Sequence, residues 1–117
     1  AHTTHFDIDR TALKSSIERA TLFGRDNSGT TVIRLNVEGG KLTIKTASER
    51  GQVNEALDIY MEGDEVNILF NANFLTAALS KMHYDALDVE MSGDLGPCVF
   101  KPKNDERYLY LLLPLRQ

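Results

Sequence analysis

The sequence predicts an α+β fold in which one unit, a strand followed by a helix and three strands, occurs twice. Two observations support this prediction: the predicted elements repeat in that order, and the two predicted helices begin alike. The segment 8–13, Ile-Asp-Arg-Thr-Ala-Leu, aligns with 70–75, Phe-Asn-Ala-Asn-Phe-Leu, and on the same offset Ile17 falls on Leu79. Two units of about 50 residues would place both helices on one side of antiparallel sheets. Chance similarity is the alternative, because helix-capping residues recur in unrelated proteins.

Length and composition are those of one globular domain. The chain has 117 residues, of which 42% are apolar and 26% charged, so it can bury a core without disulfides. The single Cys98 suits a reducing compartment such as the cytoplasm. The net charge of −4 argues against a small free-standing nucleic-acid binder, although a protein that meets DNA on one face is not excluded. No apolar run is long enough for a membrane span, and the polar residues 1–5 do not resemble a signal peptide.

The first predicted unit begins with a strand at 6–9 and a helix from about 11 to 23. Asp9 or Thr11 can cap this helix, because either side chain can accept hydrogen bonds from free N–H groups of the first turn. Gly24 is placed to end it.

Alternating apolar residues predict the three strands that complete the first unit. A Gly-Gly turn joins the first two as a hairpin. The third could instead be helical by its pattern. The predicted strands are 31–37, 42–47 and 52–61.

The second predicted unit has a strand at 66–70 and a helix that ends near Met82. Asn71 or Asn73 can cap this helix. The strands predicted after it are 86–91, 98–101 and 108–113.

The C-terminal stretch from 107 to 117 is almost continuously apolar. Pro114 has no N–H for a ladder, so regular pairing should end near Leu113. In an extended chain one set of side chains can face the core, while no downstream residues remain to cover the other. The stretch is therefore either a core strand covered by loops or one wall of an open groove for a partner segment. One set is Leu109, Leu111, Leu113 and Leu115, and the other is Tyr108, Tyr110 and Leu112.

Several segments together resemble one family, the bacterial DNA polymerase III beta subunit, or sliding clamp. The resemblance is to its third, C-terminal domain and covers essentially the whole chain. Its most specific part is the end, where Tyr-Leu-Leu-Leu-Pro-Leu-Arg at 110–116 is similar to the family's closing apolar–Pro–apolar–Arg signature. The other segments are 13–20 in the first helix, 33–35 and 42–44 in the hairpin, 70–75 at the second helix entry, and Gly96-Pro97-Cys98.

The resemblance implies a DNA-clamp domain within a ring. In the family, two subunits of three similar domains close around duplex DNA, with helices lining the hole and sheets outside. The ring tethers the polymerase and is not an enzyme, and no cofactor is implied. Residues 1–117 would be the third domain, with 1–5 as the end of the interdomain linker. The chain starts without Met, which fits one domain of a longer cytoplasmic, nucleoid-associated protein.

The resemblance also implies a pocket for short linear motifs of the DNA polymerase III alpha subunit, the clamp loader, other polymerases and repair proteins. Pro97 stands where some members have a hydroxyl residue, and Gln117 replaces an apolar last residue. The family pocket also takes residues from the preceding domain, so docking on this chain alone should be weaker. The implied pocket residues are Asn71, Phe74, Leu95, Pro97, Leu111, Leu113, Pro114, Leu115 and Arg116.

Two further surfaces follow from the resemblance. Leu22 and Phe23 would take part in ring closure with a second subunit, and burial in the core is the competing interpretation. Because the core stripe of the first helix is already filled, Leu22 is expected at the interface, and Phe23 stays open between the two. DNA would face the polar helix positions, although an ordinary solvated helix face is the favoured interpretation for any single one of them. The candidates are Lys14, Arg19, Arg25 and Lys81, with Glu18 weakening the positive charge.

No motif in the sequence points to catalysis or to a metal. His2 and His5 lie in a terminus expected to fray, without a carboxylate or cysteine arranged around them. Gly39-Gly40-Lys41 lacks the Ser or Thr and the spaced glycine of a phosphate loop. The alternative to the clamp interpretation is a stand-alone α+β domain that binds a small apolar ligand, which would require an enclosed cavity. An enzyme is the third possibility.

Overall fold

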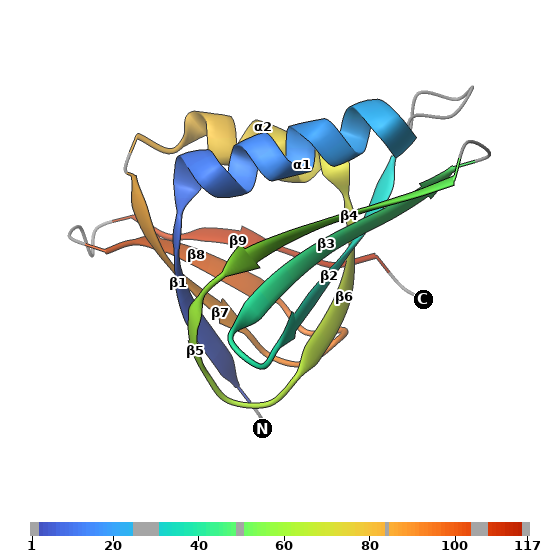
Figure 1. The fold of residues 1–117 in the computed structure, drawn as a ribbon. Coiled ribbons are helices and arrows are strands. Elements are labelled where there is room, and N and C mark those ends of the chain that lie inside the picture. Colours follow the sequence, from blue (N-terminus) through green and yellow to red (C-terminus); the bar gives the residue numbers. More distant parts are fainter. Residues whose placement is uncertain (1–2, 25–30, 49–50, 84, 104–107, 116–117) are drawn as a thin grey trace.

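The computed structural model describes residues 3–24, 31–48, 51–83, 85–103 and 108–115. These residues form two helices and two antiparallel sheets, and Figure 1 shows both helices side by side across one end of the sheets. The elements in chain order are β1 (Thr4–Asp9), α1 (Arg10–Gly24), β2 (Val32–Glu38), β3 (Lys41–Ser48), β4 (Gly51–Asp58), β5 (Tyr60–Glu62), β6 (Val66–Asn71), α2 (Ala72–Lys81), β7 (Ala86–Met91), β8 (Cys98–Pro102) and β9 (Tyr110–Leu112).

Each unit contributes strands to both sheets. The five-stranded sheet has the order β5-β1-β7-β8-β9, and the four-stranded sheet has the order β4-β3-β2-β6. Apolar side chains alternate along the strands, and the inward set forms one core with the two helices. The predicted α+β class, with both helices on one side of antiparallel sheets, is confirmed.

The predicted correspondence between the two helix entries is visible in the structure. Asp9 Oδ2 accepts a hydrogen bond from Ala12 N at 2.8 Å. Asn71 Oδ1 accepts from Asn73 N at 2.9 Å and from Phe74 N at 3.3 Å. Asp9 and Asn71 are thus the caps, rather than the alternatives at positions 11 and 73. The aligned apolar positions of the two helices are all buried: Leu13, Ile17 and Ala20 in α1, and Leu75, Leu79 and Met82 at and after α2.

One predicted strand was wrong in its extent. Residues 52–61 were expected to form a single strand or a helix, but the chain forms β4 in one sheet and β5 in the other. Ile59 stands between them, and its N–H donates to Gly40 O at 2.9 Å. Half-buried and exposed residues alternate without a break through this corner, so the sequence pattern alone gave no sign of the change of sheet.

The two ends of the described chain also differ from expectation. β1 begins at Thr4, two positions before the predicted strand, and His5 pairs with Glu90 of β7 and Glu62 of β5. His5 therefore lies in the sheet and not in a frayed terminus. β9 is shorter than predicted, at Tyr110–Leu112. No helix within the described ranges is long and apolar enough to cross a membrane.

Candidate functional site

The C-terminal segment separates its side chains as the alternation predicted. Tyr110 and Leu112 pack against the core, whereas Leu111 is 53% exposed and Leu113 72% exposed. The exposed leucines border a cavity of about 420 Å³ between this segment and the start of α2, here called the terminal groove. Its lining residues are Phe70, Asn71, Phe74, Leu75, Leu111, Leu112, Leu113 and Leu115.

The start of α2 forms the other wall of the terminal groove. The Asn71 cap holds two N–H groups of the first turn, and so it fixes the backbone position of Phe74. Phe74 is 71% exposed, while Leu75 beside it is fully buried. An exposed phenyl ring next to exposed leucines is an uncovered apolar surface, since such rings are usually buried in a core or an interface.

The last described residues connect the two sheets. β9 ends at Leu112, and Pro114 has no N–H to continue the ladder. The chain then crosses to the edge of the four-stranded sheet, where Leu115 N donates to Leu69 O at 2.8 Å. The end of regular pairing near Pro114 was predicted correctly, but this bridge to β6 was not foreseen. The pairing of β9 with β8 anchors one end of this wall of the terminal groove, and the bridge anchors the other.

The structure brings five of the predicted pocket residues together in the terminal groove. They are Asn71, Phe74, Leu111, Leu113 and Leu115. Pro114 lies in the crossing segment between two of them, and Arg116 is outside the described residues.

Leu95 and Pro97 lie in the loop between β7 and β8 and do not line the terminal groove. This loop is tied to the same sheet edge, because Asn67 N donates to Asp94 Oδ1 at 2.8 Å. Leu95 is 62% exposed, so an apolar side chain stands near that edge.

Sequence reasoning missed the lining residues Phe70, Leu75 and Leu112. Phe70 and Leu75 belong to the core, and Leu112 packs against it. A residue that serves both as core and as groove floor gives no separate signal in the sequence.

Leu22 lies outside the buried stripe of α1, as predicted. Leu22 is 69% exposed, whereas Leu13, Ile17 and Ala20 are buried. It borders a cavity of about 400 Å³ between α1 and α2. The side chain of Phe23 lies outside what the structure describes, so its predicted role remains untested.

Two of the three DNA-facing candidates that the structure describes are paired with carboxylates. Lys14 Nζ lies 3.9 Å from Glu18 Oε1, and Arg19 Nη2 lies 2.7 Å from Glu55 Oε1 of β4. Lys81 is exposed at the end of α2, and Arg25 is outside the described residues. The net positive charge on the described helix surface is therefore smaller than the count of Lys and Arg suggests.

A second groove lies in the first unit at the equivalent place and is here called the counterpart groove. Its volume is about 450 Å³. Ile8 and Asp9 occupy the positions that Phe70 and Asn71 occupy in the terminal groove, and Ala12 occupies that of Phe74. The full lining is Asp7, Ile8, Asp9, Ala12, Leu57, Asp58, Ile59 and Tyr60.

One cluster of metal-binding residue types was not foreseen. Within the described residues, His5, Asp7 and Asp88 offer ligand atoms within 4.8 Å of one another, and His5 is paired with Asp88. Lys103 Nζ lies 2.7 Å from Asp7 Oδ2, and this hydrogen bond raises the pKa of Lys103. An amine thus already neutralises part of the cluster. The spacing His5-x-Asp7 on one strand face was the available sequence signal.

Comparison with known proteins gives a consistent result. The family model of the DNA polymerase III beta subunit, C-terminal domain, matches residues 1–116. The beta sliding clamp of Staphylococcus aureus strain Mu50 is 33% identical over 111 residues, which are 93% of this chain and 29% of that protein. The corresponding clamp of Staphylococcus epidermidis is 33% identical over 103 residues, covering 86% of this chain and 27% of that protein.

Solved structures agree with these sequence relatives. The crystal structure of the DNA polymerase sliding clamp from Bacillus subtilis matches with a TM-score of 0.91 and 28% identity, covering 100% of this chain and 31% of that one. A beta subunit structure from Thermotoga maritima has a TM-score of 0.89 at 22% identity, covering 97% of this chain and 31% of that one. The chain spans less than a third of the length of these relatives.

Proposed function

The chain belongs to the family of the DNA polymerase III beta subunit, C-terminal domain, and we propose that it acts as the partner-docking and ring-closing domain of a sliding clamp. The terminal groove is the observation that supports this function. It gathers exposed Phe74, Leu111 and Leu113 around one cavity. The role proposed is binding without catalysis, in the cytoplasm.

The groove suits a short linear motif with leucine and aromatic side chains. Burial of such side chains lowers the free energy by about 25 cal/mol per Å² of apolar surface removed from water. The walls are held by the Asn71 cap on one side and by the Leu115 bridge on the other, so little ordering is needed on binding. The proposed partners are the DNA polymerase III alpha subunit, the clamp loader, and other polymerases and repair proteins that carry such motifs.

A peptide titration tests this function. A labelled peptide of the type Gln-Leu-x-Leu-Phe is added to the 117-residue chain, and its fluorescence anisotropy is measured. We expect saturable binding that weakens about tenfold in Phe74→Ala, because a central aromatic contact is lost. Tyr60→Ala is the matched control, since Tyr60 is 86% exposed but lies in the counterpart groove.

Two outcomes of that titration would contradict the proposal. One is the absence of binding at millimolar peptide, both for this chain and for a chain extended by the domain that precedes it in the family. The other is an equal loss in the two aromatic variants. Binding of small apolar dyes without peptide binding would favour the alternative, a domain for a small apolar ligand.

Ring closure is the second part of the proposed function. Leu22, together with Phe23, would meet the first domain of another subunit, and the helices would face duplex DNA. The weak net charge of the described helix surface is compatible with sliding, because strong phosphate contacts would slow movement along DNA. In a protein of full clamp length that ends with this domain, Leu22→Asp should shift sedimentation from dimer to monomer. An unchanged dimer would contradict the assignment of Leu22.

A further inference from the structure

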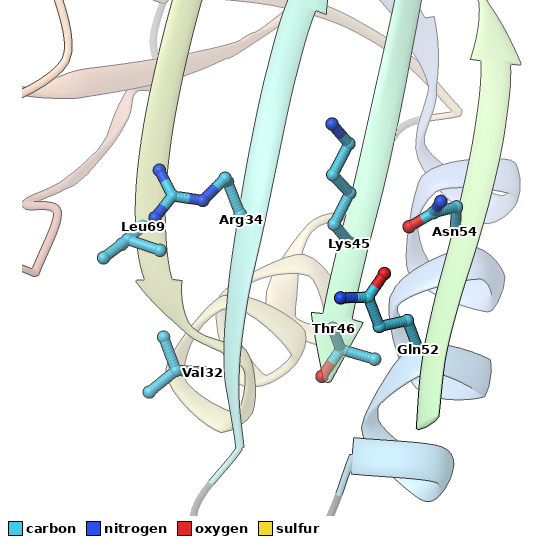
Figure 2. A pocket seen from close by; sticks show the side chains of 7 residues that line it. All are labelled: Val32, Arg34, Lys45, Thr46, Gln52, Asn54 and Leu69. Atoms are coloured by element: carbon cyan, nitrogen blue, oxygen red, sulfur yellow. The ribbon is translucent and has the colours of Figure 1, made fainter. Parts of the chain in front are cut away.

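A further cavity lies on the outer face of the four-stranded sheet. Its volume is about 470 Å³. Figure 2 shows Arg34 and Lys45 on neighbouring strands, with Gln52 and Asn54 on the next strand and Leu69 on the other side of Arg34. We call this surface the basic face and define it by its lining residues Val32, Arg34, Lys45, Thr46, Gln52, Asn54 and Leu69.

The basic face is continuous with the terminal groove. Leu115, which lines the groove, is paired with Leu69, which lines the basic face. Residues directly opposite each other on antiparallel strands project from the same side of a sheet. A single cross-strand row therefore leads out of the groove. It runs Leu115, Leu69, Arg34, Lys45, Asn54, each paired with the next.

This row begins apolar and becomes positively charged. Arg34 and Lys45 are directly opposite each other, an arrangement of like charges that costs stability unless an anion offsets it. Arg34 Nη1 donates to Asn67 Oδ1 at 2.9 Å. Among the described residues, none forms an ion pair with Lys45, which is exposed.

The opposite end of the same sheet face is different. Lys41, on the same strand and face as Lys45, lies 2.7 Å from Asp58 Oδ1 and pairs with Glu38 across the strands. Lys41 holds the pKa of Asp58 below its usual value. Lys41 is therefore matched by carboxylates far from the terminal groove, whereas no described residue forms an ion pair with Lys45, which lies nearer to it.

We propose that the basic face binds the acidic flank of a peptide whose motif occupies the terminal groove. This inference rests on the proposed function of that groove. Carboxylates of the flank would pair with Arg34 and Lys45 and accept hydrogen bonds from the amides of Gln52 and Asn54. Three strand spacings of about 4.8 Å separate Leu115 from Lys45, a distance that an extended peptide covers in about four residues. Partners with Asp or Glu at about that distance from the motif would be preferred.

Peptides that differ only in the flank test this inference. One series carries Asp and Glu about four residues from the motif, at either end, and the matched series carries Asn and Gln. At about 50 mM salt we expect the acidic flank at one end to bind about three- to tenfold more tightly than its neutral match, and to lose this advantage near 1 M salt. Lys45→Gln should remove most of the advantage. Lys41→Gln, the same change on the same strand and face, should keep it.

The results separate failure of the inference from failure of the proposed function. Equal affinities of the acidic and neutral series at both ends would overturn the basic face as a binding surface while leaving the groove intact. If Lys41→Gln and Lys45→Gln reduced the advantage of the acidic flank equally, the basic face would also be overturned. The advantage would then depend on the overall charge of the chain and not on one surface. If even the neutral-flank peptides fail to bind, the proposed function is overturned, and the inference that rests on it is overturned too.

Discussion

The terminal groove and the counterpart groove occupy equivalent places in the two units but have different surfaces. Both begin where a strand passes into a helix capped by an Asx side chain, and their volumes are about 420 and 450 Å³. The counterpart groove carries the carboxylates of Asp7, Asp9 and Asp58, whereas the terminal groove carries leucines and Phe74. Both units thus have a cavity at this place, and a few side chains make one lining acidic and the other apolar.

The two units share buried positions and differ in the side chains that line their grooves. The buried residues that align between the units, such as Leu13 with Leu75, hold the two helices in the same way. The difference lies one position earlier, where Ala12 aligns with Phe74, and at the end of each unit. Shared positions should therefore control stability equally, and the differing positions should control binding in one groove only.

The largest expected effect concerns the shared positions. Leu13→Ala and Leu75→Ala should each lower the free energy of unfolding by about 2–5 kcal/mol, because each leaves a cavity in the core. Urea denaturation followed by circular dichroism measures both. A cost below about 1 kcal/mol for one of them would show that the two helices are not held equivalently.

The next effect concerns the differing ends of the units. Leu113→Asp places a charge in the terminal groove and should weaken peptide binding about 30-fold, which is about 2 kcal/mol. Leu113 is 72% exposed, so the fold should lose less than about 0.5 kcal/mol. Tyr60→Asp makes the matched change in the counterpart groove and should leave peptide affinity unchanged. Isothermal titration calorimetry compares the two, and a similar loss from both would remove the distinction between the grooves.

Removal of either helix cap should have a smaller effect, equal on stability for the two caps but different on binding. Asp9→Ala and Asn71→Ala should each cost about 1 kcal/mol of unfolding free energy, since each leaves first-turn N–H groups without their acceptor. Asn71→Ala should also weaken peptide binding, because Asn71 fixes the turn that carries Phe74. Unfolding and binding are measured on the same samples. Loss of binding in Asp9→Ala would contradict the separate roles of the caps.

The smallest effect reports on the packing of β9. Burial raises the pKa of the Cys98 thiol from 9.0 to about 12, and Cys98 pairs with Leu112 of β9. As pH rises, the Cys98 thiol ionises first in the unfolded chain. The contribution of the buried, protonated thiol to stability is therefore complete below about pH 9 and is lost between pH 9 and 12. Relative to Cys98→Ala, the chain should lose about 0.8 kcal/mol between pH 8 and 9.5. Parallel stability curves for both proteins would mean that β9 does not shield the thiol.

Local chemistry made much of the fold predictable from the sequence. Helix caps, the hairpin turn and the alternation at the C-terminus depend on residues close together in the chain. For this reason the alternation placed Leu111 and Leu113 on one face of the C-terminal stretch, and the resemblance assigned that face to the pocket.

Long-range pairings were not predictable in this way. The bridge of Leu115 to Leu69 and the ion pair of Arg19 with Glu55 join residues far apart in the sequence. The change of sheet at Ile59 was missed because the alternation continues through it. The basic face, likewise, depends on the pairing of β2 with β6, which places Leu69 beside Arg34.

The most direct test of the distinction between the two grooves is a map of where a clamp-motif peptide binds. Backbone NMR spectra of the isotope-labelled chain are recorded during titration with a peptide of the type Gln-Leu-x-Leu-Phe. Shifts should appear at Asn71, Phe74, Leu111, Leu113 and Leu115 and should be absent at Asp7, Asp9 and Tyr60. Shifts centred on the counterpart groove, or shared equally between the two, would contradict the proposal that only the terminal groove docks partners.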